Sequence, residues 1–168
     1  DLENIKIAKE MGVTGVMQPF VRDHSDLECV KEALREAGAE DIRLFAKIEN
    51  MDGVRKLEEL LPAADEIVIA RGDLGNAVHL WDLPGVQRQI SEKCRAAGKP
   101  FMVVTQMLAS MERSPVPTRA EVNDIFHAVM DGAASIMVTG ETAVGDYPVE
   151  VIRYMVNTVR SAEKEENR

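Results

Sequence analysis

Charged side chains follow two short apolar runs of the sequence, at positions where a buried strand would end. Lys47 and Glu49 close the run that begins at Leu44, and Asp73 follows the run 67–69. Lys47 and Glu49 are two residues apart, so in an extended strand their side chains leave the same face. Two carboxylates and an ammonium group gathered at one place suit a hard divalent cation, which prefers oxygen ligands and leaves positions open for a substrate.

The segment between these charged residues predicts the connection that would bring them together. A helix is indicated there, because apolar residues recur at helical spacing: Val54, Leu57, Leu60 and Leu61. A strand, a helix and a second strand form a βαβ unit, whose crossover makes the two strands parallel. Glu49 and Asp73 would then lie at the same edge of a sheet, on strands about 4.8 Å apart.

The glycines around Asp73 would let the backbone approach a ligand closely. Gly72 and Gly75 lack side chains, so backbone N–H groups here could contact an anion. Residues 76–83, which follow, are expected to form a loop with at most a short turn of helix. A simpler interpretation is that charges close a strand because a solvated loop begins there. For Glu49 alone that interpretation is the better one. The face shared with Lys47 and the second acidic residue at Asp73 favour a site for a metal and an anion.

The same alternation of strand and helix continues along the chain. Further strands are expected at 13–20, 42–48, 100–104 and 134–138. Capping boxes predict the start of one helix at Ser25–Glu28 and of another at Thr118–Glu121. Pro84 and Pro148 suit the first turn of two more helices. The chain thus contains five expected strands, each followed by a helix, and one helix precedes the first strand.

A repeat of strand and helix is compatible with two α/β architectures, an open doubly wound sheet and a (β/α)₈ barrel. Polar residues at nearly every strand end favour the barrel, because barrel active sites draw single residues from many strands. These residues are Gln18, Lys47, Glu49, Arg71, Asp73, Thr105, Thr139 and Glu141. A dinucleotide-binding fold would instead carry Gly-x-Gly-x-x-Gly after its first strand, and the sequence contains no such motif.

Composition limits the class of protein. A length of 168 residues fits one domain with a real core. The net charge of −9 argues against nucleic acid and anionic membranes as partners, because both need a basic surface. No apolar run approaches the roughly 20 residues of a membrane-spanning helix. The two cysteines form no Cys-x-x-Cys motif and are expected to be reduced thiols of a cytoplasmic protein.

Five strands cannot close an eight-stranded barrel, because the outermost two would expose unpaired backbone groups. We therefore expect the chain to be a piece of a longer protein or to complete its barrel with another chain. The first alternative is favoured, because the sequence opens at Asp1 in the middle of the strand–helix pattern rather than at a methionine.

Several short motifs, in their order and spacing, resemble those of the pyruvate kinase family. They are Lys47-Ile48-Glu49-Asn50, Ala70-Arg71-Gly72-Asp73-Leu74-Gly75, Ala97-Gly98-Lys99-Pro100, Thr105-Gln106-Met107-Leu108, Pro117-Thr118-Arg119-Ala120-Glu121 and Gly140-Glu141-Thr142-Ala143 with Tyr147-Pro148. The resemblance covers nearly the whole chain. It implies that residues 1–168 form a partial TIM (β/α)₈ barrel, in which five parallel strands with intervening helices correspond to strands four to eight of the family barrel.

The family transfers a phosphoryl group from phosphoenolpyruvate to ADP, giving pyruvate and ATP in glycolysis. It depends on Mg²⁺ or Mn²⁺ and usually on K⁺. By this resemblance Glu49 and Asp73 would be the protein ligands of the divalent ion. Lys47 would stabilise charge on the transferring phosphoryl group and on the enolate oxygen. Backbone amides of Gly72 and Asp73 would hold the substrate carboxylate, and Thr105 would help deliver a proton to the enolate carbon.

The sequence departs from the family pattern near the implied site. Pro19 stands where members have a serine beside the nucleotide site, Asn76-Ala77 replaces the usual Val-Glu, and Thr139 replaces a common serine. Arg119 resembles a residue of the family's subunit contact, so a homo-oligomer is expected. The family's K⁺ ligands, an arginine on the phosphate and a lid domain have no counterpart in this sequence. We therefore expect the chain to supply the divalent-metal half of the site and to be inactive alone, without the remainder of the barrel or another copy of the chain.

Two other functions remain compatible with the sequence. Related barrel lyases and aldolases that act on 2-oxo acids also place Glu and Asp on a magnesium ion, and ATP formation would distinguish the kinase from them. A partial barrel could instead be a non-enzymatic assembly or regulatory module, and a tight, specific dimer would favour that alternative.

Overall fold

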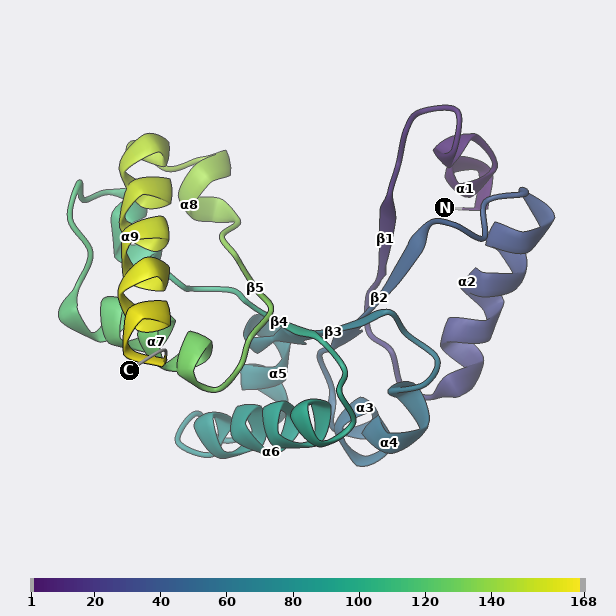
Figure 1. The fold of residues 1–168 in the computed structure, drawn as a ribbon, viewed down its shortest axis with the longest axis horizontal. Coiled ribbons are helices and arrows are strands. Elements are labelled where there is room, and N and C mark those ends of the chain that lie inside the picture. The colour runs from purple at the N-terminus through teal and green to yellow at the C-terminus, as the bar shows by residue number, and fades with distance from the viewer. Residues whose placement is uncertain (1, 167–168) are drawn as a thin grey trace. The chain divides into compact units, whose positions relative to one another are not determined.

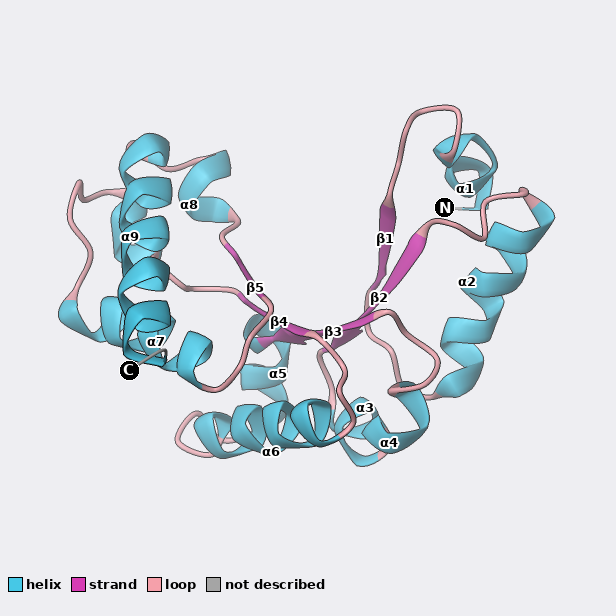
Figure 2. Ribbon diagram, viewed as in Figure 1, coloured by secondary structure: helices cyan, strands magenta, loops and turns pink. Residues whose placement is uncertain are grey.

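The computed structural model describes residues 2–166 of the chain (Figure 1). Its contacts divide the chain into two compact units, Asp1–Pro100 and Phe101–Arg168. Strands alternate with helices in both units (Figure 2). The fold class predicted from the sequence is confirmed: the protein is α/β, with five parallel strands and intervening helices.

Within residues 2–100 the first unit holds three parallel strands in chain order. β1 (Gly15–Gln18) pairs with β2 (Arg43–Ile48), and β2 pairs with β3 (Glu66–Ala70). The register places Ile48 opposite Ile69, so β2 and β3 end almost level. All five residues of β3 are buried, as is typical of a parallel strand covered on both faces. The carboxyl ends of the strands therefore lie at one edge, as the predicted βαβ unit requires.

Helices connect these strands and cover them. They are α1 (Leu2–Ala8), α2 (His24–Glu36), α3 (Met51–Arg55), α4 (Leu57–Leu60), α5 (Arg71–Ala77) and α6 (Leu83–Ala96). α1 lies beside α2 (Figure 1), and the two pack on a small apolar cluster with the residues that lead into β2. Its buried members are Ala8, Leu34, Ala39 and Ile42.

The predicted capping box at Ser25 is wrong, because α2 begins at His24 and is capped by Asp23, two residues before the predicted cap. The Asp23 backbone is extended, and its Oδ1 accepts hydrogen bonds from the Ser25 backbone N–H at 3.1 Å and from the Ser25 hydroxyl at 2.6 Å. A carboxylate two residues upstream therefore serves as the acceptor, and the serine acts as a donor. Both residue types favour N-caps, so sequence alone did not separate them.

The helix expected between β2 and β3 is broken at Lys56 into α3 and α4. Val54, Leu57 and Leu60 are nevertheless all buried. The apolar spacing continues through the break, which is why the sequence pattern did not reveal it.

No helix was expected directly after β3, but residues 71–77 form one, α5, which starts immediately at Arg71. Each glycine in a helix costs about 1 kcal/mol relative to alanine, so local propensity disfavours a helix there. Tertiary packing overrides that preference: Leu74 is fully buried, and a Cβ atom on Gly75 would lie 3.4 Å from the Leu83 side chain.

The described residues of the second unit, 101–166, form two strands, a 3₁₀ turn and three helices. They are β4 (Phe101–Val104), η1 (Ala109–Glu112), α7 (Arg119–Met130), β5 (Ser135–Met137), α8 (Gly140–Ala143) and α9 (Pro148–Glu166). β4 and β5 are parallel, and α7 lies alongside α9 (Figure 1). The predicted capping box at the start of α7 is confirmed, with the Thr118 and Glu121 side chains each bonded to the other's backbone N–H.

Cys29 and Cys94 are free thiols, and burial raises the pKa of Cys94 to about 12. Within residues 2–166, none of the helices combines the length and the apolar character needed to span a bilayer.

Candidate functional site

The side chains of Lys47 and Glu49 are in contact at the carboxyl end of β2. Lys47 Nζ lies 2.8 Å from Glu49 Oε1. The other carboxylate oxygen, Oε2, accepts a hydrogen bond of 2.7 Å from the backbone N–H of Phe20. Glu49 is only 4% exposed, so without these partners its charge would be costly to bury. The two-residue spacing thus places an ammonium group on a buried carboxylate at the edge where barrel chemistry occurs.

The connection between β1 and α2 is shaped around this carboxylate. Phe20 has a left-handed backbone with φ of 51°, and its N–H donates to Glu49. The next residue, Val21, donates its N–H to the Lys47 carbonyl at 3.3 Å. A left-handed non-glycine residue costs on the order of 1–3 kcal/mol and persists only where its surroundings fix it. The contacts with residues 47 and 49 provide that fixation.

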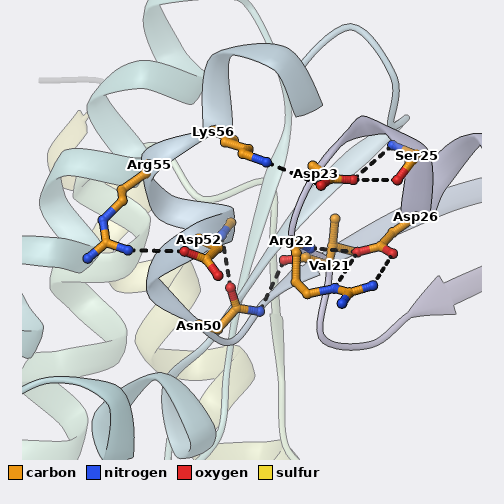
Figure 3. A network of polar contacts seen from close by, with 10 residues as sticks. Val21, Arg22, Asp23, Ser25, Asp26, Asn50, Asp52, Arg55 and Lys56 are labelled. Atoms are coloured by element: carbon orange, nitrogen blue, oxygen red, sulfur yellow. Dashed lines mark hydrogen bonds and ion pairs between the residues drawn. The ribbon is translucent and has the colours of Figure 1, made fainter.

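Asn50 links the connection between β1 and α2 to the start of α3 (Figure 3). No role for Asn50 was predicted from the sequence. Its Oδ1 accepts from the Gly53 backbone N–H at 2.9 Å and caps α3, while its Nδ2 donates to the Val21 carbonyl at 3.1 Å. A Cβ atom on Gly53 would lie 2.5 Å from that carbonyl oxygen, so only glycine permits this approach. The sequence did contain one indication of this role, because an asparagine between a predicted strand and a predicted helix is a typical N-cap.

Ion pairs extend this network along the rim of the first unit (Figure 3). Arg22 donates from Nη2 to Asp26 Oδ1 at 2.8 Å, and this guanidinium lowers the pKa of Asp26. The Ser25 hydroxyl and then Lys56 lower the pKa of Asp23 to about 2. Lys56 Nζ lies 3.2 Å from the Asp23 carboxylate and so links the start of α2 to the break between α3 and α4. These ion pairs therefore stabilise the connection between β1 and α2, whose Phe20 N–H binds Glu49.

The structure places Gly72 and Asp73 in the first turn of α5, both exposed. Glu49 directly follows β2, and α5 directly follows β3, so Glu49 and Asp73 lie after neighbouring parallel strands, at the same edge. An acidic residue in a first helical turn also interacts favourably with the helix dipole. The two acids differ in environment, because Glu49 is buried and bonded whereas Asp73 is open to solvent.

The described part of the first unit brings few acidic side chains together as possible metal ligands. Within the described residues no group of three or more His, Cys, Asp or Glu side chains is arranged to hold a metal ion. Two carboxylates at one edge still suit Mg²⁺ or Mn²⁺, because such ions keep several positions for water and for substrate oxygens.

Thr105 lies in the second unit, immediately after β4. Thr105 and Gln106 both have left-handed backbones, with φ of 79° and 54°. Thr105 is half-buried, and the following Met107 and Leu108 are fully buried. Two consecutive left-handed non-glycine residues are uncommon, and residue types did not predict them.

Comparison with known proteins places the chain in a family. Residues 1–152 match the model of the pyruvate kinase barrel domain. The pyruvate kinase of Bacillus licheniformis is 43% identical over 164 residues, which are 98% of this chain and 28% of that protein. That of Dictyostelium discoideum is 44% identical over 163 residues, 97% of this chain and 32% of that protein. That of Clostridium acetobutylicum is 42% identical over 152 residues, 90% of this chain and 32% of that protein.

The chain thus spans about a third or less of the length of the curated relatives it matches. Its five parallel strands and intervening helices form a partial TIM barrel, in agreement with the match to the barrel domain. The motifs that carry the resemblance, among them the ion pair of Lys47 and Glu49, lie within the matched residues. By sequence and by fold, this chain belongs to the pyruvate kinase family.

Proposed function

We propose that this chain supplies the divalent-metal half of the site at which a complete pyruvate kinase transfers a phosphoryl group from phosphoenolpyruvate to ADP. The observation that carries the proposal is the contact between Lys47 and the buried carboxylate of Glu49 at the carboxyl end of β2, in a chain of this family. A loop that only had to close a strand would not need a buried, cation-paired carboxylate there. Enzymes with this barrel architecture place their reactive groups at that end of the strands.

The acids of this edge fit a divalent ion. Glu49, directly after β2, and Asp73, in the first turn of α5 after the neighbouring β3, would contribute carboxylate oxygens. Each Glu49 oxygen has one protein donor and retains a further lone pair. A bound Mg²⁺ or Mn²⁺ would neutralise negative charge on the transferring phosphoryl group.

Lys47 would act beside that ion as a fixed positive charge. Glu49 holds its ammonium group at 2.8 Å, so little reorganisation is needed when negative charge develops in the transition state. In this role Lys47 stabilises the phosphoryl oxygens during transfer and then the enolate oxygen that remains. Phosphoryl transfer needs such positioning and charge neutralisation more than covalent help from the protein.

The substrate would be held by the first turn of α5. The N–H groups at a helix start lack partners within the helix, so those of Gly72 and Asp73 suit the carboxylate of phosphoenolpyruvate. Thr105 would then help deliver a proton to the enolate carbon. In that step the electrons of the enolate double bond form the new C–H bond, and the C–O bond becomes the carbonyl of pyruvate.

In the complete protein, further barrel strands would complete the site. Residues 1–168 would correspond to strands four to eight of its barrel, and the K⁺ ligands would come from outside this chain. The remainder of the barrel, or another copy of the chain, would complete the site, and we propose a cytoplasmic homo-oligomer.

A coupled assay of ATP formation tests this function in the complete protein. ATP should form from phosphoenolpyruvate and ADP only when Mg²⁺ or Mn²⁺ is present. Asp73→Asn should raise the metal concentration for half-maximal activity at least about tenfold, since even indirect partners of metal ligands contribute that much. Asp65→Asn is the matched control, because Asp65 lies just before β3, at the opposite edge, and an asparagine can still accept from the Leu44 N–H.

Three outcomes would contradict the proposal. Absence of ATP formation by the complete protein would exclude the kinase function. Cleavage of a 2-oxo acid without nucleotide would assign the site to the lyases and aldolases. An equal metal requirement in the Asp73→Asn and Asp65→Asn variants would remove Asp73 from the metal site.

A further inference from the structure

Glu141 in the second unit is a buried acid that the proposed chemistry does not use. It lies in α8 and is only 2% exposed. Its Oε1 accepts from the Leu108 backbone N–H at 3.2 Å, and its Oε2 accepts from the Thr139 backbone N–H at 2.8 Å. Main-chain donors therefore engage both oxygens of a buried carboxylate. The two donors belong to the connections that follow β4 and β5.

The first of these connections is the bend at residues 105–108, which carries Thr105. Its first two residues are left-handed, an arrangement that costs on the order of 1–3 kcal/mol per residue unless neighbours fix it. Its last two residues, Met107 and Leu108, are fully buried, and the Leu108 N–H is the one bonded to Glu141. The carboxylate thus anchors the end of the bend, three residues after Thr105.

The backbone of Glu141 is itself held firmly. A Cβ atom on Gly145 would lie 2.3 Å from the Glu141 carbonyl oxygen, so the chain passes over α8 in direct backbone contact. A Cβ atom on Gly140 would lie 2.4 Å from Oε1 of Glu112 in η1, and the Asp146 N–H donates to the Glu112 carbonyl at 2.9 Å. With α8 packed this closely on η1, the carboxylate is a rigid acceptor for both connections.

We propose that Glu141 is a positioning residue, whose carboxylate fixes the 105–108 bend and thereby the hydroxyl of Thr105. This inference depends on the proposed function only for the role of Thr105 in protonating the enolate. A carboxylate is required because two N–H donors need two acceptor oxygens. Glutamine has the same shape but would turn an NH₂ group toward one of the two N–H donors.

The matched control is Glu121, a second carboxylate of the same unit that also accepts from two backbone amides. Its Oε1 accepts from the Ser110 N–H and its Oε2 from the Thr118 N–H, both at 2.7 Å. These bonds join η1 to the start of α7 and do not involve the 105–108 bend. Glu121→Gln therefore measures how much the exchange of a carboxylate for an amide lowers stability and turnover at a site that does not contact the bend.

The experiment compares Glu141→Gln with Glu121→Gln in the complete protein by three measurements. Hydrogen exchange should accelerate at the amides of Leu108 and Thr139 in the first variant only. Turnover should fall about 100-fold in Glu141→Gln, because a small misplacement of a reacting group costs that much. The KM for phosphoenolpyruvate should change by less than about twofold, since binding is not affected. Exchange of the pyruvate methyl protons with solvent, which isolates the step of Thr105, should fall by the same factor as turnover.

Two results would overturn the inference. One is equal turnover of the two variants at equal thermal stability, which would leave Glu141 a purely structural role. The other is unchanged exchange at the Leu108 amide in Glu141→Gln. If the complete protein forms no ATP, the proposed function fails, yet amide exchange still decides whether Glu141 holds the bend. Should Glu141→Gln not fold, Glu141→Asp gives the same readouts, with a carboxylate one methylene shorter.

Discussion

Glu49 shows how one residue can join local structure to a site. Its carboxylate is buried, yet each oxygen has a donor, one from a side chain and one from the backbone. The backbone donor exists because Phe20 adopts a left-handed conformation. Removing the negative charge should therefore affect both the proposed metal site and the connection that ends at Phe20.

We predict that Glu49→Gln weakens Mn²⁺ binding to the complete protein at least about tenfold, because it removes one of two carboxylate ligands. A metal titration without substrate measures this directly. Glu66→Gln is the matched control: Glu66 is also buried and also pairs with a cation, Arg43 at 2.9 Å, but it begins β3 at the opposite edge. Mn²⁺ affinity that is the same in both variants would contradict the assignment of Glu49.

Some contacts of these residues could be predicted from the sequence, and others could not, for a physical reason. The contact between Lys47 and Glu49 follows from the period of a strand, in which residues two apart share a face. The bond from the Phe20 N–H was not predictable, because it needs a conformation that phenylalanine rarely adopts. The bridge from Glu141 to Leu108 joins residues 33 positions apart and depends on tertiary packing.

At the scale of helices and strands, the sequence predicted the order of elements better than their starts. All five strands were expected, since buried parallel strands appear as short apolar runs. The capping box of α7 was also expected, because Thr118 and Glu121 satisfy each other at fixed spacing. At α2 the N-cap acceptor is Asp23 instead of the predicted Ser25. At α5 the burial of Leu74 outweighs the low helix propensity of Gly72 and Gly75.

The capping box of α7 leads to a prediction about pH. Burial alone would raise the pKa of Glu121, but hydrogen bonds from Ser110 and Thr118 outweigh it and lower the pKa below its usual value of 4.5. A carboxyl group whose pKa is lowered by folding stabilises the protein above pH 4.5, and this contribution is lost as the pH falls through the lower, folded value.

We therefore expect Glu121→Gln to lower the thermal unfolding temperature near neutral pH, and the difference from the wild type to shrink as the pH falls below 4.5. Thermal unfolding between neutral and acidic pH measures this. Glu150→Gln, at an acidic residue in the first turn of α9, controls for loss of a charge near a helix start. A difference that stays constant with pH would show that the hydrogen bonds do not depend on the charge of Glu121.

At the scale of the whole molecule, the fold is that of a barrel segment. In the first unit β1 pairs only with β2 among the strands that the structure describes, and in the second unit β5 pairs only with β4. A closed barrel leaves no such edges, because every strand has two neighbours. The match to about a third or less of each relative's length agrees with this architecture.

The 168 residues by themselves should consequently form negligible ATP from phosphoenolpyruvate and ADP, even with Mg²⁺ and K⁺ present. The acids at Glu49 and Asp73 would hold the divalent ion, but the potassium ligands and the arginine on the phosphate would have to come from the other barrel strands. Addition of a polypeptide that supplies those strands and the lid should restore turnover, and the same addition to a Glu49→Gln chain should not. Turnover by the unaccompanied wild-type chain would show that five strands suffice for the reaction. Light scattering of the same sample would then distinguish a monomer from a dimer in which a second copy completes the barrel.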